Sequence, residues 1–389
     1  MSEFSAALVR NEHDTGRVEA YLPTYCVQNH ASNIMPLDNG DLLCVWFSGT
    51  QEGIADISVY MSRLNKGETE WSEPVKLSDD SSRSEQNPVL FPAPNGDLWL
   101  LWTAQKAGNQ DTSIVRCRIS RDNGYTWGPI RVLFDKQGTF IRQPITVLAN
   151  GEWLLPIFYC KSVPGQKWVG DEDYSAVKIS GDQGATWEEY IVPESLGCVH
   201  MNIETLHDGS LVALFRSRWA DYIYLSRSQD NGRTWSKPVP TELPNNNSSI
   251  QVTGLLSGNL AVVFNNMSAH GITERRASLY DDIPDDEEDD KKVEAAPQEN
   301  SNFRKAFWGA PRAPLTIAIS TDGGKTWPYK RDIEVGDGFC LTNNSKDALN
   351  REYSYPSVKQ TTDGLIHVTF TYFRQRIKYV RVNEEWIKQ

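Results

Sequence analysis

The chain has 389 residues, and its 39% hydrophobic and 23% charged residues are the balance of a globular protein. The formal net charge of −12 argues against nucleic acid as a partner, and no apolar run approaches the roughly 20 residues that a membrane helix needs. The N-terminal residues lack the basic and apolar regions of a secretory signal, which predicts a cytoplasmic protein; secretion stays open if a leader segment has been removed. Six widely spaced cysteines without a C-x-x-C pair are expected to be free thiols.

Six short turns that end in glycine recur along the chain, and each is followed by an apolar strand such as LLCVWF or LVALFR. Glycine supplies the positive φ that such a turn requires. In chain order the turns are Asp38-Asn39-Gly40, Pro94-Asn95-Gly96, Ala149-Asn150-Gly151, His207-Asp208-Gly209, Leu256-Ser257-Gly258 and Thr362-Asp363-Gly364. This regular spacing indicates an internal repeat.

A second motif, S-x-D-x-G-x-T-W, alternates with these turns. It occurs four times, from Ser120 to Trp127, Ser180 to Trp187, Ser228 to Trp235 and Ser320 to Trp327, and a degenerate copy runs from Ser62 to Trp71. The aspartate is expected to cap backbone N–H groups of a hairpin turn, and the tryptophan to cover it. The last unit, from Tyr353 to Trp386, lacks this motif.

Together the two motifs describe a unit of four antiparallel strands. Six such units predict an all-β protein with the fold of a six-bladed β-propeller, in which an N-terminal strand closes the ring. Because a closed ring cannot be divided, residues 1–389 are expected to form one domain. Residues 277–305 contain the acidic run PDDEEDDKK and are interpreted as a disordered surface insertion.

The first strand of each propeller unit lines the central channel, so equivalent positions near its start converge. Counting back nine or ten residues from each glycine turn gives polar residues in every unit. These are His30, Gln86 with Asn87, Arg142, His200, Ser249 and Tyr355. Histidine, arginine and tyrosine side chains gathered in one concavity are typical of a binding site.

The four S-x-D-x-G-x-T-W motifs resemble the Asp-boxes, or BNR repeats, of sialidases. Outside the acidic stretch the whole chain resembles the sialidase superfamily, with local matches at HASNI, FSGTQEGIADISVYMSR, NPVLF, LPNNNSS and EYSYPSV. Asp-boxes are specific for the fold but not for a function, because proteins without enzymatic activity also carry them.

The resemblance implies roles for individual residues. Sialidases bind the substrate carboxylate with three arginines and use a tyrosine nucleophile with a glutamate partner and an aspartic acid/base. Arg216 and Arg312 match the second and third arginines, and Tyr355 matches the nucleophile.

Three positions depart from the sialidase pattern. His30 stands where the first arginine is expected, the R-I-P signature is absent, and His200 replaces the glutamate partner. The acid/base corresponds to Glu52, on an exposed loop at the channel mouth, with Asp56 as the second choice. Substrate binding is then expected from Arg216, Arg312, Arg142, Asn87, Gln86 and Asp56.

Three functions fit these residues. In a glycoside hydrolase that cleaves a terminal sialic, ulosonic or uronic acid, Glu52 protonates the glycosidic oxygen and Tyr355, assisted by His200, attacks the anomeric carbon. In a lyase, the arginines neutralise a uronate carboxylate, and His30, His200 or Tyr355 removes the C5 proton. In a binding module the same pocket holds a carbohydrate without turnover.

The expected partner is therefore a carbohydrate with an acidic terminal sugar, and the oligomeric state stays open. His30, His200 and Glu52 lack the local spacing of a metal site, and no nucleotide-binding motif is present. The sequence predicts no metal and no cofactor.

Overall fold

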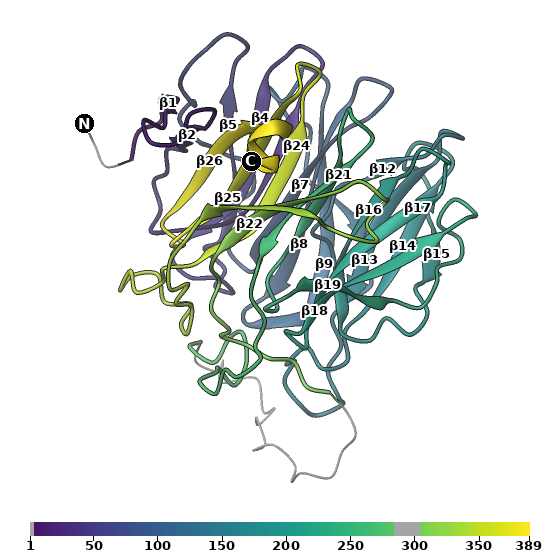
Figure 1. Cartoon of the computed structure of the whole chain (residues 1–389). Coiled ribbons are helices and arrows are strands. Elements are labelled where there is room, and N and C mark those ends of the chain that lie inside the picture. The colour runs from purple at the N-terminus through teal and green to yellow at the C-terminus, as the bar shows by residue number, and fades with distance from the viewer. Residues whose placement is uncertain (1–3, 284–303) are drawn as a thin grey trace.

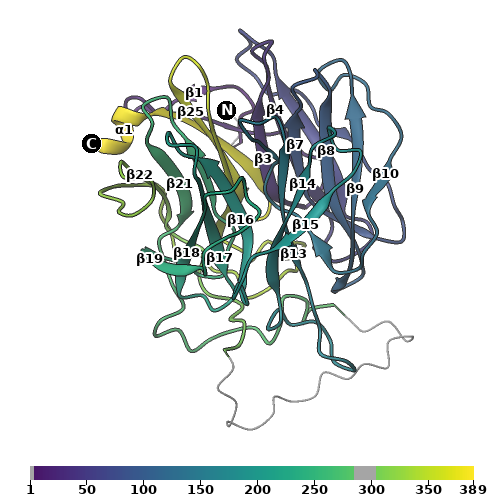
Figure 2. The ribbon, with the colours of Figure 1, turned by 90° about the vertical axis from the view of Figure 1, so that its right-hand side faces the viewer.

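The computed structural model describes residues 4–283 and 304–389 and arranges them as six antiparallel sheets around a central axis (Figures 1 and 2). The predicted all-β, six-bladed β-propeller is confirmed. The first blade contains β3 (Gln28–Pro36), β4 (Leu42–Gly49), β5 (Ser58–Leu64) and β6 (Val75–Lys76). The second contains β7 (Ser84–Pro92), β8 (Leu98–Lys106), β9 (Asn109–Ser120) and β10 (Arg131–Phe134).

The next three blades repeat this order from the channel outward. In the third, the inner strand is split into β11 (Thr139–Phe140) and β12 (Thr146–Val147), followed by β13 (Trp153–Tyr159), β14 (Tyr174–Ser180) and β15 (Glu188–Ile191). The fourth contains β16 (Cys198–Thr205), β17 (Leu211–Ser217), β18 (Tyr222–Ser228) and β19 (Val239–Pro244). The fifth contains β20 (Gln251–Gly254), β21 (Leu260–Asn265), β22 (Leu315–Ser320) and β23 (Tyr329–Glu334).

The sixth blade joins the two ends of the chain, as predicted. It contains β24 (Tyr353–Gln360), β25 (Leu365–Tyr372) and β26 (Arg376–Asn383), and is completed by β2 (Val18–Tyr21) and β1 (Val9–Arg10) from the N-terminal segment. Strand β2 pairs antiparallel with β26, which closes the ring by main-chain hydrogen bonds. A short helix, α1 (Glu384–Lys388), follows. In the part of the chain described, no helix is long and apolar enough to cross a membrane.

The two sequence motifs form the turns at one end of the blades. The six glycines of the glycine turns have φ between +81° and +90° and connect the first and second strands. Each S-x-D-x-G-x-T-W motif connects the third and fourth strands. In the first of these motifs Asp122 accepts hydrogen bonds from the Thr126 N–H and hydroxyl, which lower the pKa of Asp122 to about 2.

Apolar side chains fill the space between neighbouring blades. One cluster, for example, packs Leu43 and Val45 of the first blade against Leu90 and Trp102 of the second. Such burial stabilises the ring by about 25 cal/mol per Å² of apolar surface. The connections at the opposite end vary in length: residues 107–108 connect β8 and β9, whereas residues 160–173 connect β13 and β14.

The channel-lining strands contain an irregularity that places side chains toward the axis. In β3, β7, β16 and β24 the register shifts where a residue has positive φ, namely Ala31, Asn87, His200 and Tyr355. A positive φ costs a residue with a side chain about 1–2 kcal/mol. Strain of this kind, repeated in four of the six blades, is typical of functional sites, where a bulge redirects a side chain.

Most of the predicted insertion at 277–305 lies outside the described residues. Residues 277–283 and 304–305 are described, and Leu279 and Tyr280 are buried rather than at the surface. They pack with Trp168 and Trp308 in one apolar cluster at the channel mouth. The six cysteines are free, as expected.

Candidate active site

The ring of Tyr355 lies at the centre of the predicted site. The guanidinium carbons of Arg142, Arg216 and Arg312 each lie 5.5 Å from the centroid of this ring. The imidazole centroids of His30 and His200 lie 4.2 Å and 5.8 Å from it. The structure therefore brings six of the predicted residues together, from five blades, and we call them the central cluster.

Two arginines of the central cluster have no counter-charge. Among residues 4–283 and 304–389, neither Arg142 nor Arg216 takes part in an ion pair, whereas the neighbouring Arg218 binds Asp173 at 2.7 Å. Burial lowers the pKa of Arg142 and of Arg216 to about 10. Both remain charged near neutral pH, and buried charges without a partner are unfavourable. An anionic ligand would supply the missing charge.

The hydrogen-bond donors of these arginines are only partly used. Arg216 Nη1 donates to Tyr355 Oη at 2.6 Å and Arg216 Nε donates to Asn247 Oδ1 at 2.8 Å. Arg142 Nη2 donates to the main-chain carbonyls of Ser32 and Tyr355. Arg142 Nη1 and Arg216 Nη2 are buried without a partner among the described residues. They are free to bind a carboxylate, for which guanidinium geometry is suited.

Both histidines of the cluster are neutral near pH 7. Burial, and then the positive charges of the surrounding arginines, hold the pKa of His30 and of His200 well below its usual value. His30 Nδ1 lies 2.8 Å from Thr371 Oγ1, while His30 Nε2 has no partner in the described structure. His200 Nδ1 lies 3.0 Å from Ser249 Oγ, and its Nε2 faces Arg216. His30 therefore presents an unused ring nitrogen beside Tyr355, whereas both nitrogens of His200 are occupied.

The site also contains a buried carboxylate that sequence reasoning missed. Glu352 is fully buried, binds Arg312 at 2.7 Å and contacts Arg374. Burial alone would raise the pKa of Glu352, but Arg374 and Arg312 outweigh this and hold it at about 2. Glu352 thus neutralises Arg312, which leaves Arg142 and Arg216 as the arginines without a counter-charge.

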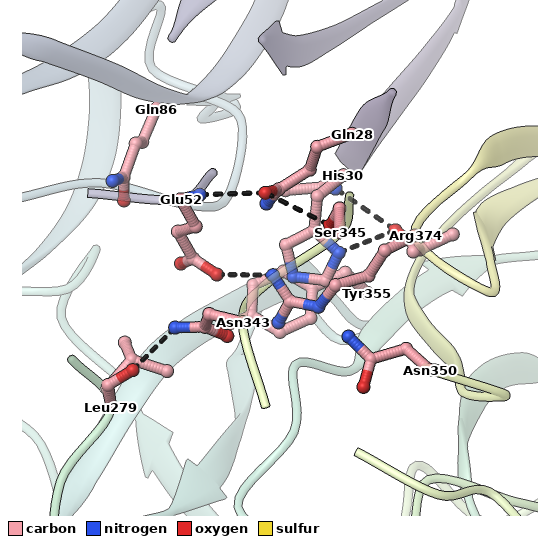
Figure 3. A network of polar contacts seen from close by, with 12 residues as sticks. Gln28, His30, Glu52, Gln86, Leu279, Asn343, Ser345, Asn350, Tyr355 and Arg374 are labelled. Atoms are coloured by element: carbon pink, nitrogen blue, oxygen red, sulfur yellow. Dashed lines mark hydrogen bonds and ion pairs between the residues drawn. The ribbon is translucent and has the colours of Figure 1, made fainter. Parts of the chain in front are cut away.

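Glu52 differs from the expectation of an exposed residue. Only 3% of its surface is accessible, and it binds Arg374 at 2.6 Å (Figure 3). The loop that carries it is held down because the Glu52 N–H donates to Gln28 Oε1 at 2.7 Å. Arg374 therefore binds both buried carboxylates of the site, and Glu52 is engaged in an ion pair rather than free at the mouth.

The other predicted residues lie at the margin of the central cluster. Asp56 is exposed and its Oδ1 accepts a hydrogen bond from the Thr50 N–H, so it caps its own turn. Gln86 and Asn87 are buried on β7 (Figure 3 shows Gln86). Gln86 donates to Ser84 Oγ at 2.9 Å.

Two segments cover the site. The Leu279 carbonyl oxygen accepts a hydrogen bond from the Asn343 side chain (Figure 3). Tyr280 Oη accepts a hydrogen bond from Gln110 at 2.9 Å. A Cβ atom on Gly53, next to Glu52, would lie 2.8 Å from the Tyr280 ring. Tyr280 therefore packs directly on the loop that carries Glu52.

Arg374, Glu352 and Asn247 were missed for identifiable reasons. Glu352 and Asn247 lie inside the quoted segments EYSYPSV and LPNNNSS, but nothing in the sequence tells them from turn residues. Arg374 lies in the turn between β25 and β26, where a charged residue is ordinary. Among the described residues no group of three or more His, Cys, Asp or Glu side chains is arranged to hold a metal ion.

Comparison with known structures identifies the fold. The intramolecular trans-sialidase from Ruminococcus gnavus, in complex with oseltamivir carboxylate, matches 93% of this chain and 95% of its own, with a TM-score of 0.61 and 14% identity. A protein of unknown function from Dyadobacter fermentans matches 94% and 97%, with a TM-score of 0.65 and 13% identity. The Hadza microbial sialidase Hz136 matches 93% and 67%, with a TM-score of 0.66 and 14% identity.

At these identities the likeness shows the fold alone. A search of curated protein sequences finds no match. The family model of the BNR repeat-like domain matches residues 40–368, which is most of the chain. The protein therefore belongs to the BNR repeat-like family and has a sialidase-like β-propeller fold.

Proposed function

We propose that this protein is a lyase that cleaves a glycan at a uronic acid by β-elimination. The observation that carries the proposal is the pair of uncompensated arginines, Arg142 and Arg216, beside the unused Nε2 of a neutral His30. A glycosidase mechanism needs a carboxylic acid that donates a proton. The two buried carboxylates at this site, Glu52 and Glu352, are instead ion-paired with Arg374.

The proposed reaction needs no co-reactant. Arg142 and Arg216 bind the uronate carboxylate, and their charge makes the C5 proton more acidic. His30 Nε2 removes that proton, the C5 electron pair forms a C4=C5 double bond, and the bond between C4 and the leaving oxygen breaks. The hydroxyl of Tyr355 donates its proton to this oxygen. The products are an unsaturated sugar and a glycan with a new hydroxyl group.

The contacts around these groups support the division of roles. Arg216 donates to Tyr355 Oη, so the tyrosine proton is free to point toward a ligand, and the same contact stabilises the phenolate left after transfer. The four arginines that depress the pKa of His30 include Arg142 and Arg216. A bound carboxylate offsets their charge and makes His30 a stronger base when substrate is present.

A sialidase-like hydrolase is the second candidate, and the contact between Arg216 and Tyr355 favours it. In that reaction Tyr355 passes its hydroxyl proton to His30 Nε2 and attacks the anomeric carbon of a terminal acidic sugar, with Arg216 stabilising the phenolate. A protonated Glu52, released from Arg374, donates its proton to the glycosidic oxygen as the bond between that oxygen and the anomeric carbon breaks. Water then releases the sugar, so the products together gain the mass of one water molecule.

The test is an incubation with 4-linked oligouronates, in which C4 of a uronate carries a glycosidic oxygen, and with sialosides, read by mass spectrometry and near-ultraviolet absorbance together. A lyase gives an absorbing unsaturated sugar without added water. Tyr355→Phe keeps the ring and removes the proton donor, so we expect kcat to fall by about 10²–10⁴. The matched control is Tyr222→Phe on the exposed edge of β18, which should leave the rate unchanged.

The other outcomes discriminate between the candidates. Release of a saturated acidic sugar with added water, lost in Tyr355→Phe, would refute the lyase and support the hydrolase. Saturable binding of these glycans without any product, in wild type and variants alike, would identify a binding module.

A further inference from the structure

We propose that a pocket next to the active site binds a second anionic group of the glycan, a carboxylate or a sulfate ester. The substrate would then be an oligosaccharide with acidic groups on at least two sugars. The link to cleavage rests on the proposed function, but the pocket can be tested by binding alone.

The pocket has a volume of about 380 Å³, within the range of small-ligand sites. Three segments form it: the link from β2 to β3, the loop before β24, and the turn between β25 and β26. Its wall includes Tyr25, Cys26, Ser345, Lys346, Gln375 and Arg376.

The charge of the pocket is opposite to that of the protein. Lys346 and Arg376 both line it, and in the described part of the chain neither takes part in an ion pair. The Arg376 guanidinium lies over the Phe4 ring at 5.3 Å, which holds it at the pocket. Two adjacent unpaired cations on a chain with a net charge of −12 are expected to attract an anion.

The pocket also offers a surface for a sugar ring. Tyr25 lines the pocket and is 69% exposed, the largest exposure of any large hydrophobic side chain among the described residues. Interaction with Glu73 raises the pKa of Tyr25, and the exposed ring is accessible for packing. Exposed aromatic rings next to charged donors are common in sites for polar ligands with apolar faces.

The pocket and the active site share a wall. Ser345 donates to Gln28 Oε1 at 3.2 Å, and the same oxygen accepts the Glu52 N–H (Figure 3). On the other side Gln375 follows Arg374, the residue that binds Glu52, and its carbonyl oxygen accepts a hydrogen bond from Asn29 at 2.8 Å. The pocket wall is therefore connected to the active site through Gln28 on one side and the turn of Arg374 on the other.

The test compares ligands with one and with several acidic groups. We would measure dissociation constants of tetraglucuronate, and of a neutral tetrasaccharide with a single terminal glucuronate, by calorimetry in the Tyr355→Phe background. Lys346→Glu should weaken tetraglucuronate binding about tenfold, with little change for the singly charged ligand. Lys325→Glu, the same charge change on an exposed turn at the opposite end of the blades, should alter neither.

The result that overturns the pocket is an equal effect of Lys346→Glu on both ligands, or none on either. Arg376→Gln, which makes a milder change, provides a second variant if Lys346→Glu does not fold. A tetrasaccharide with a sulfate ester as its second anion distinguishes a carboxylate site from a general anion site. If it binds as tightly as tetraglucuronate, the pocket accepts either group; if it binds weakly, the pocket is specific for a carboxylate.

Failure of the pocket and failure of the proposed function give different results. Cleavage of tetraglucuronate at equal kcat/KM by wild type and Lys346→Glu would overturn the pocket and keep the lyase. Binding that depends on Lys346 but is followed by no product in wild type would support the pocket and overturn the lyase.

Discussion

Glu352 offers a quantitative test of the charge arrangement at the site. It is fully buried between Arg312 and Arg374 and also accepts a hydrogen bond from Ser354 Oγ at 2.6 Å. We expect Glu352→Gln, which keeps the shape and removes the charge, to lower the free energy of unfolding by about 3 kcal/mol at pH 7.

Two routes give this magnitude. The folded-state pKa of about 2 lies about 2.5 below the ordinary value of 4.5, and 1.36 kcal/mol per pKa unit gives about 3 kcal/mol. Breaking a buried ion pair by removing one partner costs about 3–5 kcal/mol. Because the pKa of Glu352 is lower in the folded than in the unfolded state, this stabilisation is complete above pH 4.5 and is lost as the pH falls toward 2.

Urea denaturation of wild type and Glu352→Gln from pH 7 to pH 3 measures the effect. The difference in free energy of unfolding should shrink to about 1 kcal/mol at pH 3, where the unfolded glutamate is already protonated. Glu68→Gln, on an exposed turn, is the control and should show no difference at either pH. A difference for Glu352→Gln that stays constant over this range would refute the assignment of a charged, arginine-bound Glu352.

Two further predictions concern the histidines and the turns. Because the pKa values of His30 and His200 lie well below 6.5, we expect the pH profile of kcat/KM to be flat through pH 6.5, and an acid limb centred there would contradict this. Gly209→Ala and Gly232→Ala place alanine at nearly equal φ, +81° and +82°. A Cβ at Gly209 meets no atom within 4 Å, whereas at Gly232 it lies 2.3 Å from Leu154 Cδ1. In urea denaturation Gly232→Ala should therefore lower the free energy of unfolding by about 1–3 kcal/mol more than Gly209→Ala does. Equal losses for the two variants would show that backbone strain alone is responsible.

Much of the fold could be predicted from local chemistry. The glycine of each short turn and the aspartate of each Asp-box act on backbone atoms a few residues away, so their spacing already defines strands and blades. The position of Tyr355 relative to Gly364 also follows from strand length. The positive φ of Tyr355 and the bulge around it could not be predicted, because they depend on neighbouring inner strands.

The electrostatics of the site depend on side chains that the sequence pattern does not connect. Glu52 precedes a glycine in a polar loop, which indicates exposure, but packing of Tyr280 against Gly53 buries it. Likewise, a carboxylate that binds two arginines from different blades gives no periodic signal. The sequence by itself determined the repeat, the six blades and the polar residues that face the channel, because these follow from local turn chemistry and strand periodicity. Only the tertiary structure decided which arginines lack a counter-charge and which carboxylates bind Arg374, because these ion pairs join residues between 22 and 322 positions apart in the chain.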